Sequence, residues 1–231
     1  MPPLLPEIAL LHEHIYARKV LDRVGHMPDQ ERLHGVVEEK KRKLRELREA
    51  VPLSALQIAE PANIEAMASL YDRFDVGTLK YIEKNRFRWV SPGPDWTEPD
   101  LFEFIPRVNR PFEFTPPGGT NIVPRNMITD VGTIPRLLGL FSRGLTVWGY
   151  APAFIVHDWE FELHHCGKTN KTFDQVRDTM MHLIKTLMED NVVPKSPFNF
   201  WLVYQGIDSN IARRYWNRDP PLCTLLPDDP E

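Results

Sequence analysis

The chain has 231 residues, of which 42% are hydrophobic and 26% are charged, and its formal net charge is −4. This length suits one large domain, or one domain with a substantial appendage, and it can bury a real core. The slightly acidic balance provides no overall attraction to nucleic acid or to an anionic membrane surface. No apolar run approaches 18 residues, so we expect no membrane span.

The two cysteines, Cys166 and Cys223, are too few and too isolated to indicate a disulfide framework or a CxxC metal site. The first residues carry neither a basic leader nor a small-residue cleavage site. A soluble protein in a reducing cytoplasm is the simplest expectation.

Residues 1–60 predict a helical hairpin joined at GHMPDQ. In its second helix Lys40 interrupts the apolar seam, and glutamates surround the basic run KKRKLR. This pattern favours a solvated helix with a narrow contact stripe over a nucleic-acid patch. The nucleic-acid alternative would require binding that depends steeply on salt. Docking or homo-oligomerisation through the hairpin is the more useful hypothesis.

Residues 61–75 predict a further helix whose shared face carries Ile64, Met67, Ala68 and Tyr71. After residue 78 the sequence pattern changes to short runs of aromatic and β-branched residues, separated by breaks that contain proline. The runs are LKYIEKNRFRWV, LFEFIP and PFEFTPP. These runs indicate the strands of a small antiparallel sheet. A loop with one further short strand is expected over residues 116–126.

The rest of the chain is expected to be helical. IPRLLGLF begins a short helix, GYAPAFIVHDWEFEL a buried one, and TFDQVRDTMMHLIKTLMED a long amphipathic one whose Thr172 and Gln175 have capping-box spacing. FNFWLVYQGID predicts a helix or a strand. The sequence therefore predicts an α+β fold with a hairpin appendage at 1–60, the main domain at 61–218 and an irregular tail at 219–231.

Asp130 lies in the turn TDVGTIP, where Gly132 permits an unusual backbone, Thr133 can cap the next helix and Pro135 fits its first turn. Asp130 is therefore held in a tight turn. Two interpretations stay open: Asp130 and Thr133 belong to a functional site, or they satisfy backbone N–H groups at a helix start.

His157 and Asp158 follow the apolar stretch AFIV, so their backbone enters a buried segment where polar groups need partners. Adjacent helical residues point about 100° apart, so one of the two is expected to face a pocket or the sheet. The alternative is a core histidine bonded to a carbonyl, with Asp158 bound to Arg136 or Arg177.

His164, His165 and Cys166 do not indicate zinc, because His157 and His164 are two helical turns apart, about 10 Å along a continuous helix. An exposed helix end with histidines near the C-terminal dipole fits better. Asp178, one turn into the long helix beside Arg177, is the more interesting carboxylate.

The succession TDVGTIPR, AFIVHDW, a helix with Asp178 and the aromatic FNFWLVY resembles DUF1353, an uncharacterised family often encoded by phages or prophages. The resemblance covers roughly residues 110–216. Val131 and Trp159 depart from the family pattern, which usually has Gly and often Tyr there. The shared polar positions are Asp130, Gly132, Thr133 (usually Ser in the family), Pro135, His157, Asp158 and Asp178.

The family has no agreed activity, but these residue types are those of divalent-metal hydrolysis or acid/base catalysis. We expect a hydrolase-like site with His157, Asp130, Asp158 and Thr133 as its catalytic residues, and Asp130, His157, Asp158 and Asp178 as the ligands of a divalent metal. The partner would be an unknown small substrate. The alternative is a non-enzymatic, phage-related assembly or host-interaction protein whose polar motif is a structural staple. The likeness of the His-Asp dipeptide to HD phosphohydrolases is weak, since no separate upstream histidine of that fold is found.

Overall fold

The computed structural model describes residues 35–42, 63–81, 86–91, 101–107, 109–130, 147–218 and 223–225. Apart from Gly35, they all belong to one compact unit, Val36–Glu231. Helices and small antiparallel sheets alternate in blocks along the chain, so the predicted α+β class is confirmed. The hairpin expected at 1–60 and the tail at 219–231 lie largely outside the described residues.

The predicted aromatic strands form two small sheets rather than one. The strands are β1 (Thr78–Lys80), β2 (Arg86–Ser91), β3 (Leu101–Ile105), β4 (Glu113–Thr115) and β5 (Met127–Thr129). β1 pairs with β4, and the second sheet has the order β2-β3-β5, with antiparallel pairing throughout. The short strand expected over 116–126 is a single bridge from Ile122 to Phe114. β5 ends at Thr129, the first residue of the stretch TDVGTIP that the sequence predicted as a turn.

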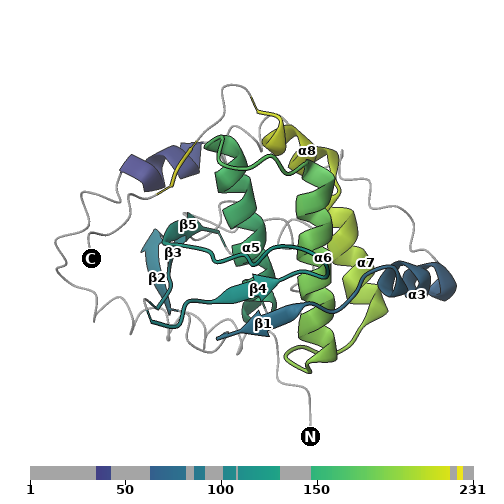
Figure 1. The fold of residues 1–231 in the computed structure, drawn as a ribbon. Coiled ribbons are helices and arrows are strands. Elements are labelled where there is room, and N and C mark those ends of the chain that lie inside the picture. The colour runs from purple at the N-terminus through teal and green to yellow at the C-terminus, as the bar shows by residue number, and fades with distance from the viewer. Residues whose placement is uncertain are drawn as a thin grey trace, which may run out of the picture. The chain divides into compact units, whose positions relative to one another are not determined.

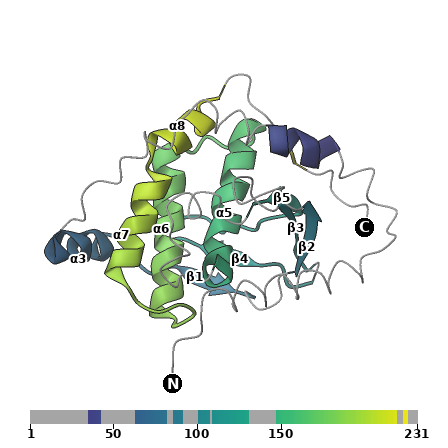
Figure 2. The ribbon, with the colours of Figure 1, turned by 180° about the vertical axis from the view of Figure 1, so that it is seen from behind.

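Two long helices, α5 (Val147–His165) and α6 (Phe173–Glu189), run side by side (Figure 1). The sheet β2-β3-β5 lies on the other side of α5 from α6, and the helix α7 (Pro197–Ile207) packs against α6 (Figure 2). The ambiguous FNFWLVYQGID segment is therefore a helix. The short helix α8 (Asn210–Trp216) follows and contacts α5.

The capping box predicted for the long amphipathic helix is confirmed. The backbone N–H of Gln175 donates to the Thr172 side chain, and the Gln175 side chain accepts from the Thr172 backbone N–H at 2.8 Å. The predicted apolar stripe is fully buried at each of its positions, which are Val176, Met180, Leu183, Ile184 and Leu187. The capping box therefore marks the start of α6, and the 3.6-residue period marks its face toward the core.

Helix α3 (Ile64–Asp72) begins after the N-cap Asn63 and packs on α7. Met67 and Tyr71 are buried as predicted, but Ile64 is 84% exposed. The prediction that Ile64 shares the buried face is wrong, because the first turn of α3 projects beyond the surface that the later residues contact.

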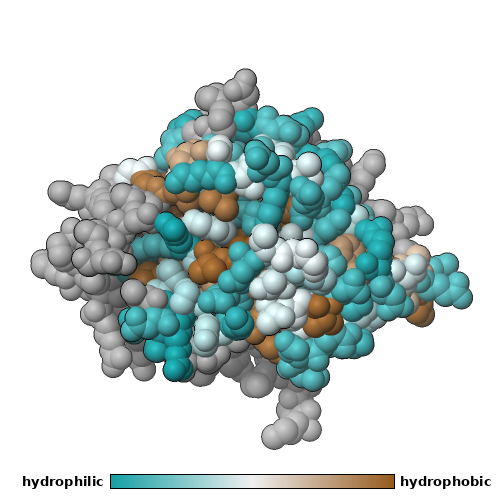
Figure 3. Space-filling model, viewed as in Figure 1, coloured by the Kyte–Doolittle hydropathy of each residue, from teal (hydrophilic) through white to brown (hydrophobic). Residues whose placement is uncertain are grey.

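The hydrophobic core gathers residues from both sheets and from α3, α5, α6 and α7. On the face shown in Figure 3, hydrophilic residues cover most of the described surface, and hydrophobic residues show in separate patches. None of the helices among the described residues is long and apolar enough to cross a membrane.

Candidate functional site

The end of β5 and the middle of α5 bring Thr129 and Asp158 together. The Thr129 hydroxyl donates a hydrogen bond of 2.6 Å to Oδ2 of Asp158. Thr129 is fully buried, whereas the Asp158 side chain keeps 19% of its surface exposed. Asp158 is thus a partly open carboxylate on a helix whose neighbouring residues are almost all buried.

His157 directs Nδ1 toward the other oxygen of the same carboxylate. The distance from Nδ1 to Oδ1 of Asp158 is 3.6 Å. The imidazole side chain is 8% exposed and packs against the Phe161 ring, with 4.4 Å between the ring centroids. A carboxylate beside Nδ1 favours the tautomer that carries its proton there, which leaves Nε2 as the basic nitrogen.

A lysine from the other end of the chain completes this cluster. Lys40, in the helical residues 35–42, is only 5% exposed. Its ammonium donates to the backbone carbonyl of Ile128 and lies 3.4 Å from Oε1 of Glu162. Glu162 is one helical turn beyond Asp158 on α5, so the lysine joins the helix to the β5 strand.

Charge explains why a lysine is stable in this buried place. Burial alone would lower the pKa of Lys40, but the negative charges of Glu162, Asp158 and Asp130 outweigh it and raise the pKa above its usual range. Lys40 is therefore a cation at the centre of a group of carboxylates.

Asp158 is correspondingly held as an anion. Burial would raise the pKa of Asp158, but the hydrogen bond with His157, the charge of Lys40 and the Thr129 hydroxyl together lower it below its usual range. The carboxylate therefore acts as an acceptor and a negative charge at neutral pH.

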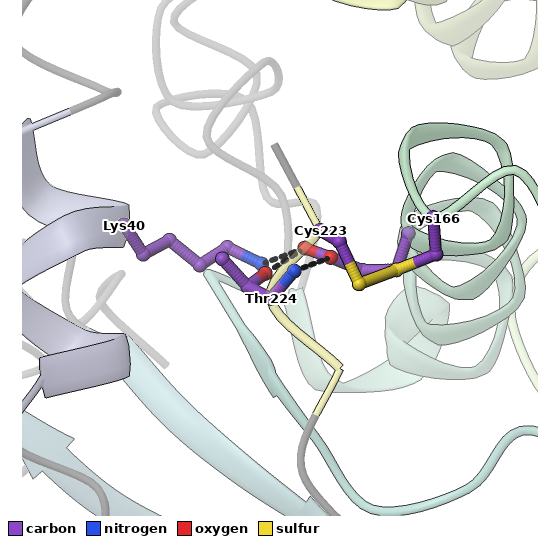
Figure 4. The surroundings of a disulfide bond; sticks show 5 residues. Lys40, Cys166, Cys223 and Thr224 are labelled. Carbon is purple, nitrogen blue, oxygen red and sulfur yellow. Dashed lines mark hydrogen bonds and ion pairs between the residues drawn. A yellow bond between two sulfur atoms is a disulfide. The ribbon is translucent and has the colours of Figure 1, made fainter. Parts of the chain in front are cut away.

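The segment 223–225 closes the cluster on the Glu162 side. The backbone N–H of Thr224 donates to Oε2 of Glu162 at 3.0 Å, and the Thr224 hydroxyl donates to Oε1. The preceding residue, Cys223, forms a disulfide with Cys166 at the end of α5 (Figure 4). The two cysteines thus pair across 57 residues, which their isolation in the sequence did not indicate. Disulfides are typical of oxidising compartments, so the cytoplasmic location stays only a prediction.

The structure brings together only some of the site residues predicted from the sequence. His157 and Asp158 meet, and the charge of Asp130, which directly follows β5, acts on Lys40. Asp178 instead receives a hydrogen bond of 2.8 Å from Arg177. Thr133, with Gly132 and Pro135, lies outside the described residues.

Arg177 is not the partner of Asp158 that the structural alternative proposed. It binds Asp178 and also contacts Asp174 and Asp208, each at 2.9 Å. This group of ion pairs joins α6 to the turn between α7 and α8. Arg136, the other arginine considered, lies outside the described residues.

The histidines at the end of α5 have backbone partners. Nε2 of His164 lies 3.0 Å from the carbonyl of Trp216, and Nε2 of His165 lies 3.0 Å from that of Tyr215. Their place in the last helical turn is confirmed, but the expected exposure is wrong for His165, which is 3% exposed. The helix end is covered by α8, whose Trp216 ring stacks on His164.

Within the described residues, no three or more His, Cys, Asp or Glu side chains are arranged to hold a metal ion. The carboxylates near Asp158 already share the ammonium of Lys40, and Asp178 pairs with Arg177. The divalent metal predicted at Asp130, His157, Asp158 and Asp178 therefore stays a prediction.

Sequence reasoning missed Lys40, Glu162 and Thr224. One signal was available: a lone lysine in the apolar seam of a helix requires a buried acidic partner. Glu162 gave no comparable signal, because a glutamate near a helix end is usually solvated.

Comparison of the chain with protein-family models, curated proteins and solved structures found no match. The resemblance to DUF1353 therefore stays a prediction, and the function is argued from the cluster itself.

Proposed function

We propose that the chain is a hydrolase-like enzyme whose reacting groups surround Asp158. The observation that carries the proposal is the partly exposed Asp158 carboxylate, which faces Nδ1 of His157 and is kept ionised by His157, Lys40 and Thr129. An ionised carboxylate that orients an imidazole is the usual support for a general base.

In this proposal Nε2 of His157 removes a proton from a water molecule as that water attacks an ester, phosphoester or amide. The resulting imidazolium is stabilised by Asp158, and it returns the proton to the leaving group. The separation of 3.6 Å between Nδ1 and Oδ1 is long for a hydrogen bond, but such contacts commonly shorten when substrate binds.

Asp130 and Thr133 are proposed to contact the substrate from the TDVGTIP turn. In an alternative form of the proposal His157 would be a metal ligand, with Asp130 and Asp158, instead of the base, and the divalent ion would polarise the bond under attack. The cytoplasmic location and the relation to phage-encoded proteins belong to the same proposal.

The test is a panel of chromogenic p-nitrophenyl esters, phosphate mono- and diesters, and p-nitroanilides, each with Mg²⁺, Mn²⁺, Zn²⁺ or a chelator. We expect turnover of at least one substrate class and a loss of about 100-fold or more in His157→Gln. His182→Gln is the matched control, because His182 lies on α6 and contacts Asp75 rather than this cluster. Turnover that survives in His157→Gln would refute the assignment.

One observation favours the second candidate, a non-enzymatic assembly or host-interaction protein. Lys40, Glu162 and Thr224 link parts of the chain that are 122 and 62 residues apart, as a structural staple would. In that case His157→Ala should lower the free energy of unfolding by about 1 to 3 kcal/mol, as removal of a buried polar partner does. A catalytic histidine more often tolerates replacement or becomes more stable when replaced.

A further inference from the structure

The disulfide, Glu162 and Lys40 form one continuous chain of contacts that the proposed hydrolytic function does not require. Cys166 directly follows α5, four residues after Glu162, and its backbone N–H donates to the carbonyl of Glu162 at 2.9 Å as in a continuing helical turn. Both side chains are therefore on the same side of the helix. Cys223 and Thr224 are consecutive, so the disulfide and the Thr224 hydrogen bonds fasten the same short segment at two neighbouring points (Figure 4).

Thr224 supplies both of the hydrogen-bond donors that the segment offers to Glu162. Its N–H meets Oε2 and its hydroxyl meets Oε1. Oε1 also faces the ammonium of Lys40 at 3.4 Å. Both side chains of this ion pair are nearly closed to solvent, at 6% and 4% exposed for Lys40 and Glu162. Thr224 is 6% exposed, so the segment both orients the carboxylate and lies in the buried cluster.

We propose that the Cys166–Cys223 disulfide is a redox-controlled clamp that holds Lys40 in the cluster by keeping Thr224 on Glu162. Oxidised, the bond keeps 223–225 beside Glu162 and so raises the local concentration of the segment there, and weak individual contacts suffice to hold it. Reduced, the segment keeps only its hydrogen bonds and must be ordered at the cost of chain entropy. The clamp is then released, and the Lys40 ammonium becomes accessible to solvent.

The redox step is balanced by a phosphine reductant. The phosphorus gives two electrons to the S–S bond and becomes the phosphine oxide by taking oxygen from water. The two protons of that water end on Cys166 and Cys223 as thiols. A small-molecule disulfide re-forms the Cys166–Cys223 bond by thiol-disulfide exchange, and is itself reduced to two thiols that take up the two electrons and two protons.

The consequence for chemistry at Asp158 rests on the proposed function, because Lys40 is one of the groups that keep this carboxylate ionised. The clamp itself is independent of catalysis. It is therefore tested through the accessibility of Lys40 rather than through turnover. If labelling supports the clamp but the substrate panel shows no turnover, the proposed function alone fails.

The experiment acetylates the full chain with an N-hydroxysuccinimide ester, with and without a phosphine reductant, and quantifies each lysine by mass spectrometry. Lys41 is the adjacent reference and Lys80 the exposed one, with side chains 23% and 53% exposed. In the oxidised protein we expect Lys40 to react at least about tenfold more slowly than Lys80, because the raised pKa keeps the amine protonated and burial keeps the reagent away from it. On reduction we expect Lys40 alone to speed up, by about threefold or more.

With the disulfide intact, Thr224→Val should speed up acetylation of Lys40, because it removes the hydroxyl that donates to Glu162. Thr224→Ser keeps a hydroxyl, so in that variant Lys40 should react as slowly as in the wild type. Circular dichroism confirms that the reduced protein keeps its fold, and a mass-based thiol count confirms complete reduction. Unchanged acetylation of Lys40 in folded, fully reduced protein would overturn the proposal. A rise of equal size at Lys40 and Lys41 would also overturn it, because it would show loosening of residues 35–42 as a whole.

Discussion

Replacement of Lys40 by methionine removes the cation from the cluster while keeping a side chain of similar length. At the separation of 3.4 Å from Glu162 and an effective dielectric constant of about 20, the attraction is about 5 kcal/mol. The cost of losing it has a ceiling, because a carboxylate without its cation can take up a proton, which costs an ordinary glutamate about 4 kcal/mol at pH 7. We therefore expect Lys40→Met to lower the free energy of unfolding by about 3 to 4 kcal/mol, in the range for broken buried pairs.

The assay is urea unfolding followed by tryptophan fluorescence and by circular dichroism, with coincident transitions required. Lys41→Met is the matched control, because Lys41 forms only a partly exposed ion pair with Glu38. Its replacement should change the free energy of unfolding by less than about 1 kcal/mol. Equal costs for the two variants at pH 7 would refute the placement of Lys40 as a buried cation.

Further predictions concern other contacts of the fold. Thr129→Val should lower the free energy of unfolding by about 2 kcal/mol at pH 7, because the hydrogen bond to the charged Asp158 carboxylate is lost. Because the folded pKa of Asp158 is lowered, this contribution is present above the unfolded pKa and should vanish as the pH falls through the folded one, which urea titrations across acid pH would check. Thr172→Ala should lower the free energy of unfolding by about 1 kcal/mol in thermal unfolding, and Thr172→Ser should lower it less. Equal losses in the two variants would show that the capping box does not stabilise α6. Arg177→Met should lower the free energy of unfolding by about 1 kcal/mol, because Arg177 links α6 to Asp208. The loss should be smaller at high salt, and a loss that salt does not change would argue against the ion pairs.

Local patterns predicted the parts of the fold that depend on local physics. The period of α6 and its capping box, the apolar run of α5 and the aromatic strands each depend on residues within one segment. The pairing of strands into two sheets was not predictable, because register and partner choice depend on the whole core rather than on any one strand.

Of the contacts in the candidate site, only the one between the sequence neighbours His157 and Asp158 was predictable. His157 and Asp158 stood out because polar residues inside an apolar helix need partners. Lys40 did not, because its partners Ile128 and Glu162 are 88 and 122 residues away along the chain. The disulfide was also missed, because a single pair of cysteines has no spacing pattern that would identify it.

The central claim is that Asp158 is an ionised carboxylate held by His157, Lys40 and Thr129, with Lys40 as its buried cation. The most direct measurement is the pKa of Asp158 from a ¹³C-carboxyl NMR titration of aspartate-labelled protein, assigned with Asp158→Asn. We expect a pKa below the usual aspartate range in the wild type and a clear rise in Lys40→Met. A wild-type pKa at or above that range, or no change in Lys40→Met, would contradict the claim.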